Sequence, residues 1–133
     1  MVANFPNDDI QFEGHLRLGL LFLTKKRYED AITSFSIAIR SPEDRMAALA
    51  QFKLGEAYLE GGNRDLAALQ FSKVVYLYPQ QAEVMEEALL KLGTLYVEEK
   101  KFSEAKQVYK KLLEKTHRED RREMAKKMLD QIQ

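Results

Sequence analysis

The feature that most constrains this chain is a residue pattern that occurs three times in the same order. In each copy a Leu-Gly pair is followed by an aromatic residue three positions after the glycine, an alanine at twelve and a second aromatic at sixteen. The glycines are Gly19, Gly55 and Gly93, which stand 36 and 38 positions apart. Three copies in one register predict a repeated structural unit.

The clearest copy, residues 48–81, shows what that unit is. Apolar residues recur at helical spacing on both sides of the turn sequence Gly61-Gly62-Asn63, and Pro79 follows the second run. This order predicts a helix, a tight turn and a second helix that stops before the proline. The other two copies have Lys26 and Lys100 at the position of the turn glycine, so we expect those turns to be less tight.

The small residues of the pattern have a packing reason. Glycine inside a helix costs about 1 kcal/mol relative to alanine, so three glycines in one column indicate a close helix crossing. Packed helix axes lie roughly 8 to 10 Å apart, and small side chains allow that approach. The predicted crossing residues are Gly19, Ala31, Gly55, Ala67, Gly93 and Ala105.

These motifs resemble the tetratricopeptide repeat, whose signature is Leu-Gly, an aromatic residue, a glycine turn, an alanine, an aromatic residue and a closing proline. The resemblance implies an all-α, right-handed superhelix of antiparallel helix pairs, an α-solenoid. It places repeats at about 12–45, 48–81 and 86–119 and a capping helix at about 119–132, in one domain over 10–133 after an irregular lead over 1–9. The family period is about 34 residues. We therefore expect the extra residues between repeats, at 45–47 and 82–85.

The helix boundaries follow from caps and breakers. We expect helices over 10–25, 28–40, 44–60, 63–78, 83–99 and 103–116, followed by the capping helix. Asn63 and Ser103 are the predicted N-caps, since their side chains can accept a hydrogen bond from the first turn. Tyr76 and Tyr78, beside Pro79, are interpreted as packing residues rather than as a recognition motif.

Composition excludes several classes of function. Lys plus Arg and Asp plus Glu each number 21, so the formal net charge is zero, and no basic patch for nucleic acid is predicted. The excess of basic residues over 110–127 is interpreted as a solvated face, with an acidic partner as the alternative.

The longest apolar run, Leu18–Leu23, is too short to span a membrane. The N-terminus does not read as a secretory signal. We expect a cytoplasmic protein by default, and a periplasmic one if the chain is trimmed from an exported precursor.

No constellation of catalytic residues emerges. The chain has no cysteine, and its two histidines, His15 and His117, belong to different repeats. Phosphate-binding and zinc-protease motifs are absent from the sequence. We therefore predict no enzyme activity, no cofactor and no metal.

The resemblance implies a protein or peptide partner, because first helices of such arrays line a concave groove that commonly binds peptides. The groove positions carried over are Leu16, Arg17, Leu20, Phe52, Lys53, Glu56, Leu59, Leu90, Lys91 and Thr94. They predict an apolar floor between a basic and an acidic line. Leu16 and Leu20 replace the Lys and Asn with which some members bind a carboxylate. The apolar positions suit an amphipathic segment.

A structural role is the alternative. The first helix is apolar on nearly every face, which a neighbouring helix or the lead segment could cover. Alternatively, Leu16, Leu20 and Leu23 could bury against a second copy in a homodimer. They could equally pack on further repeats of a longer array, because three repeats are about the minimum for a stable stack.

Overall fold

The computed structural model describes residues 7–132, and this part of the chain is built from helices joined by short connections. In chain order they are α1 (Asn7–Thr24), α2 (Tyr28–Ala38), α3 (Asp44–Glu60), α4 (Arg64–Leu77), α5 (Ala82–Glu98), α6 (Phe102–Lys115) and α7 (Glu119–Ile132). The sequence predicted an irregular lead over 1–9. That prediction is wrong for residues 7–9, which are helical. Residues 1–6 lie outside the described part.

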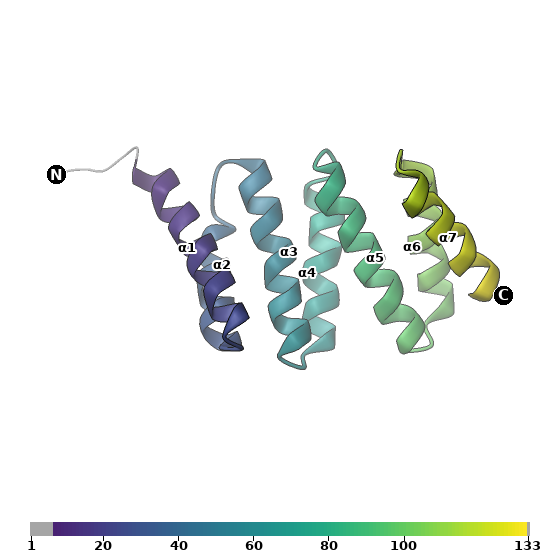
Figure 1. The fold of residues 1–133 in the computed structure, drawn as a ribbon, viewed down its shortest axis with the longest axis horizontal. Coiled ribbons are helices and arrows are strands. Elements are labelled where there is room, and N and C mark those ends of the chain that lie inside the picture. Colours follow the sequence, from purple (N-terminus) through teal and green to yellow (C-terminus); the bar gives the residue numbers. More distant parts are fainter. Residues whose placement is uncertain (1–6, 133) are drawn as a thin grey trace.

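The helices form two layers (Figure 1). The first layer contains α1, α3, α5 and α7, and the second layer, behind it in this view, contains α2, α4 and α6. Each helix packs on the next along the chain, and α3 also contacts α1 and α5 within the first layer. Since contacts run only between neighbours, the chain is an all-α solenoid with α1 and α7 at its opposite ends.

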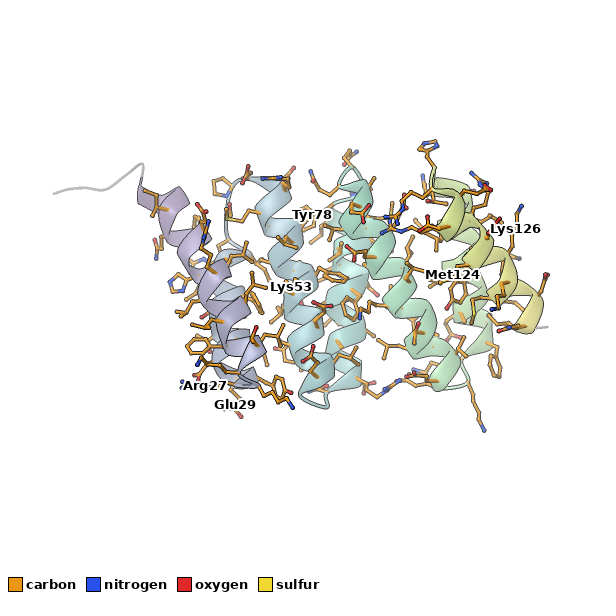
Figure 2. The ribbon with its side chains drawn as sticks, in the orientation of Figure 1. Arg27, Glu29, Lys53, Tyr78, Met124 and Lys126 are labelled. Atoms are coloured by element: carbon orange, nitrogen blue, oxygen red, sulfur yellow. The ribbon has the colours of Figure 1, made fainter. Side chains whose placement is uncertain are left out.

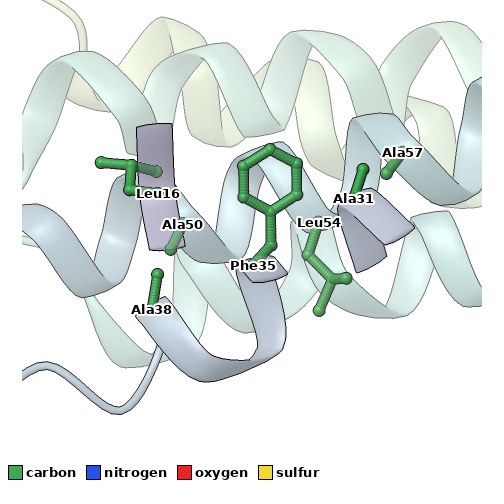
Figure 3. Close-up of a cluster of buried hydrophobic side chains, with 7 residues drawn as sticks. All are labelled: Leu16, Ala31, Phe35, Ala38, Ala50, Leu54 and Ala57. Atoms are coloured by element: carbon green, nitrogen blue, oxygen red, sulfur yellow. The ribbon is translucent and has the colours of Figure 1, made fainter. Parts of the chain in front are cut away.

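The core consists of three apolar clusters, each built around one helix of the second layer. The first cluster contains Leu16, Ala31, Phe35, Ala38, Ala50, Leu54 and Ala57 (Figure 3). The second and third are arranged in the same way around Phe71 of α4 and Tyr109 of α6. Gln51 is also buried, and its amide donates a hydrogen bond to Gln70 across the α3–α4 contact.

The three glycines of the repeated pattern lie against the second aromatic of their own hairpin. A Cβ atom on Gly19 would lie 2.5 Å from Phe35 Cε1, and one on Gly55 would lie 2.6 Å from Phe71 Cε1. On Gly93 it would collide with the Tyr109 ring. The aromatic ring therefore occupies the volume that any other side chain would need.

The extra residues between repeats are not where the sequence suggested. Residues 45–47 and 82–85 are helical, in α3 and α5, so that expectation is wrong. The connections between hairpins are 39–43 and 78–81. α2 has 11 residues and α4 has 14. Pro42 prevents α2 from continuing through the connection, because the residue before a proline, here Ser41, disfavours the helical conformation.

The turns inside the three hairpins have the same geometry, so the expectation of looser outer turns is wrong. Lys26 and Lys100 have φ of 63°, and Gly62 has φ of 95°. In each turn the residue that follows this position donates its backbone N–H to the backbone carbonyl of the first aromatic of the pattern. In the second hairpin this bond runs from Asn63 to Tyr58 at 2.8 Å. The two lysines therefore adopt a left-handed conformation that glycine adopts without cost.

The shared turn, rather than a capping side chain, determines where the second helix of each hairpin begins. Asn63 caps α4 as expected, since its Oδ1 accepts a hydrogen bond from the Leu66 N–H at 3.1 Å. Ser103 does not cap α6, which begins one residue earlier, at Phe102, with Lys101 as N-cap. The turn ends at the same repeat position whether or not a capping side chain is present.

We predict that Gly55→Ala lowers the free energy of unfolding by about 1 to 3 kcal/mol, because the added methyl group overpacks the contact with Phe71. Gly14→Ala is the control. Nothing lies within 4 Å of a Cβ at Gly14, so its helix should gain up to about 1 kcal/mol. Urea denaturation measures both variants, and equal stabilities would contradict the packing role of the glycine.

We also predict that Lys100→Gly raises the free energy of unfolding by about 1 kcal/mol, since it relieves the left-handed conformation of a residue with a side chain. Lys25→Gly is the matched control, because its φ is not positive and glycine only adds flexibility to the unfolded chain. Thermal and urea denaturation test this. A loss of stability with Lys100→Gly would show that the turn carries no such strain.

Candidate functional site

Most of the predicted groove residues reach the surface of the first layer. Arg17 and Thr94 are exposed. The half-buried members are Leu20, Lys53, Glu56, Leu59, Leu90 and Lys91. They come from α1, α3 and α5, which stand side by side in Figure 1, and Lys53 lies midway along α3 (Figure 2). The first layer therefore presents one continuous mixed face, which we call the first-layer face.

Two predicted groove residues belong to the core instead. Phe52 is 3% exposed, and the centre of its ring lies 5.3 Å from that of Phe71 in α4. Leu16 is 8% exposed and lies in the first apolar cluster. The phenylalanine ring is large enough to reach the second layer, where pairing with another ring buries more apolar area than the surface would. Neither side chain can serve as an open ligand contact in this conformation.

A group of three charged residues lies at the centre of the first-layer face. The Glu56 carboxylate is 3.0 Å from Lys53 Nζ, one turn earlier on α3, and 3.7 Å from Lys91 Nζ on α5. Glu60 lies one turn after Glu56 on α3, and the two lysines offset the repulsion between these like charges. The cluster has two positive charges and one negative charge, so a net positive charge remains for a ligand.

The acidic edge of the same face, formed by Glu98 and Glu99 at the end of α5, is also partly neutralised. Arg64, the first residue of α4, lies 2.6 Å from Glu98 and 3.2 Å from Glu99 at the end of α5. These two contacts raise the pKa of Arg64 above its ordinary value. The edge is therefore less acidic than a count of its carboxylates indicates.

The second layer contains a hollow that the sequence reasoning missed. It has a volume of about 490 Å³ and lies between α4 and α6, with α5 beneath. Tyr76, Pro79, Tyr96 and Val108 are among its lining residues. Tyr76 is 85% exposed, so its interpretation as a packing residue is wrong. The sequence contains a signal for this exposure, because Tyr76 lies outside the helical stripe of α4 that contains Ala67 and Phe71.

Two arginines of the basic segment near the C-terminus contact acidic residues of α5. Arg121 is buried, and its guanidinium lies 2.9 Å from Glu86 and 2.7 Å from Glu83. Arg118 binds Glu83 and Asp120. Partial burial raises the pKa of Glu83, but the two arginines lower it by more, so the net pKa is below the ordinary value. These contacts hold α7 against α5.

The described residues offer no assembled catalytic or metal site. His15 is on α1 and His117 follows α6, at opposite ends of the array (Figure 1). In the part of the chain that the structure covers, no three His, Asp or Glu side chains are grouped so that they could hold a metal ion. Across residues 7–132, no helix combines the length and the apolar character that crossing a membrane requires.

Helical hairpins stacked in two layers, with a continuous mixed face on the first layer, define an α-solenoid. A family model described as the tetratricopeptide repeat matches residues 13–82, and a second model of the same description matches 87–115. The chain belongs to the tetratricopeptide repeat family. Domains of this family are generally protein-interaction modules and typically non-catalytic scaffolds. No curated protein matches this sequence at a significant level.

The buried ion pair gives a stability prediction. Arg121→Ala should lower the free energy of unfolding by about 3 kcal/mol, because it leaves the buried Glu86 carboxylate without its partner. Arg118→Ala is the control and should cost under about 1 kcal/mol, since its contacts are exposed to solvent. Urea denaturation distinguishes the two.

A double variant tests the cause. Arg121→Met combined with Glu86→Leu should recover most of the lost stability, because no unpaired charge stays buried. If Arg121→Ala alone is no worse than Arg118→Ala, the pair does not anchor α7.

Proposed function

We propose that this chain is a non-catalytic scaffold that binds a peptide or amphipathic segment of a partner protein on the first-layer face, in the concave groove implied by the repeat. The observation that carries the proposal is the row of half-buried leucines, Leu20, Leu59 and Leu90, on three adjacent helices beside the Lys53–Glu56–Lys91 cluster. Apolar contacts supply affinity, and the charges fix the orientation of the ligand.

The charge of the cluster indicates the ligand. Glu56 already accepts contacts from both lysines, so a second carboxylate can pair with Lys91, whose side chain is 41% exposed. We therefore expect a ligand with apolar side chains on one side and an acidic residue beside them. With Phe52 and Leu16 in the core, the apolar contacts come from Leu20, Leu59 and Leu90.

The homodimer alternative loses one of the residues on which it was based, because Leu16 is in the core. Leu20 and Leu23 are half-buried beside that core, and Leu20 also belongs to the first-layer face. The apolar side chains that α1 does expose are Ile10, Leu18 and Leu21.

To test the proposal, peptides would be selected from a displayed library of 16-residue sequences against the whole chain. Their dissociation constants would then be measured by fluorescence anisotropy. Lys91→Glu should weaken a selected peptide by about tenfold, equivalent to about 1.4 kcal/mol. Lys73→Glu, which reverses an exposed lysine on α4 in the second layer, should change binding by less than about twofold.

Amide chemical shifts of the labelled chain would locate the same peptide. We expect changes around Leu20, Leu90 and Thr94. A selected peptide that is insensitive to Lys91→Glu but is lost with Tyr76→Ala would place binding in the second-layer hollow and contradict the proposal.

A further inference from the structure

One apolar surface lies apart from the first-layer face, on the outer side of α1. Ile10 is 68% exposed, Leu18 is 38% exposed and Leu21 is 49% exposed. Gly14 lies among them on the same side of the helix, with nothing within 4 Å of its Cβ position. We call these four residues the free face of α1.

The residues at the equivalent repeat positions of α3 and α5 show what such a surface contacts in the rest of the array. The equivalent residues are Met46, Ala50, Leu54 and Ala57 in α3, and Val84, Ala88, Leu92 and Leu95 in α5. There they pack against the second-layer helix of the preceding hairpin, α2 or α4. Leu54 and Leu92 are only 5% and 4% exposed, against 38% for Leu18. The free face thus has the residue pattern of an interface between hairpins.

The small residue in this set supports the comparison. Ala50 and Ala88 are fully buried where a second-layer helix crosses them, and Ala125 of α7 is buried in the same column. A glycine in mid-helix reduces helix stability, and this cost is offset where the missing side chain lets another helix approach closely. Gly14 is therefore suited to a helix that crosses α1 at that point.

The opposite end of the array is built differently. The outer side of α7 has Arg122, Lys126 and Asp130 where the equivalent residues of α5, Met85, Leu89 and Gly93, are buried. Figure 2 shows Lys126 on this outer side. A charged surface closes the array toward water at α7, whereas α1 leaves an apolar surface exposed.

The occupant of an interface of this type has a defined pattern. Each second-layer helix presents a small residue, an aromatic four positions later and an apolar residue three positions after that. The three stripes are Ala31, Phe35 and Ala38; Ala67, Phe71 and Val74; and Ala105, Tyr109 and Leu112. Within residues 7–132 all three are already buried between neighbouring helices. This part of the chain has no such helix left for α1.

We propose that the free face of α1 binds an amphipathic helix of a partner protein that carries this small–aromatic–apolar stripe. The partner helix lies across Gly14 as α2 lies across Ala50 and α4 across Ala88. It extends the second layer by one helix and covers Ile10, Leu18 and Leu21. This site is separate from the first-layer face and needs no ligand there.

The probe is a stapled peptide with the sequence of α4 and its flanks, residues 63–78. The staple replaces the side chains at 69 and 73, which are exposed in α4 and lie away from its stripe. Fluorescence anisotropy with the whole chain should show saturable binding of one peptide per chain. The same peptide with Phe71→Glu should bind at least tenfold more weakly, because the aromatic residue is the centre of the stripe.

Matched variants of the chain locate the site. Leu21→Glu should weaken binding at least tenfold, whereas Leu69→Glu, at a leucine of nearly equal exposure (47% against 49%), should change it by less than twofold. Gly14→Arg should also abolish binding without lowering the melting temperature, since the free chain has room for the side chain.

Three results would overturn the proposal. The first is the absence of saturable binding, and the second is an equal effect of Leu69→Glu and Leu21→Glu. The third is a dimer in light scattering that Leu21→Glu converts to a monomer, because a second copy would then occupy the free face.

Discussion

Every hairpin depends on one contact, the crossing at which a glycine of the first layer admits the aromatic ring of its partner helix. Gly55 and Phe71 are 16 positions apart, as are the corresponding residues of the other two hairpins. Because the separation inside the hairpin is constant, the variation in repeat length lies after the second aromatic, where α2 ends early with 11 residues and α4 continues to 14. It also holds the turn in one shape, so Lys26 and Lys100 adopt a left-handed conformation at a cost of about 1 kcal/mol each.

Several charges of this chain act within the fold. Lys53 and Lys91 share Glu56, Arg64 contacts the end of α5, and the buried Arg121 binds Glu86. These pairs fix neighbouring helices relative to one another. On the first-layer face they leave the Lys91 side chain partly exposed beside the leucines, where its charge can orient a ligand.

The sequence predicted the fold well because its period is carried by residues with only one structural role. A mid-helix glycine followed by an aromatic at sixteen positions strongly favours a close crossing of two paired helices, and α3 was predicted to the residue. The candidate site was harder to predict, because the position of a residue in the repeat does not determine how deeply its side chain is buried. Phe52 and Leu90 share a column, yet only the phenylalanine reaches the core. The pairing of Arg121 with Glu86 joins residues 35 positions apart and has no local signal.

The two proposed sites share α1, and the architecture determines how they can influence each other. Leu20 lies on the first-layer face and Leu21 on the free face, so adjacent residues of one helix serve different surfaces. In a solenoid each unit is stabilised by its neighbours. α1 has a neighbour on only one side, and its outer side lacks the packing that α3 and α5 have on both sides. A helix docked on the free face would supply that missing neighbour and restrain α1. A ligand on Leu20 would then meet a surface that is already ordered, so binding at the two sites would be mutually favourable without any change of fold.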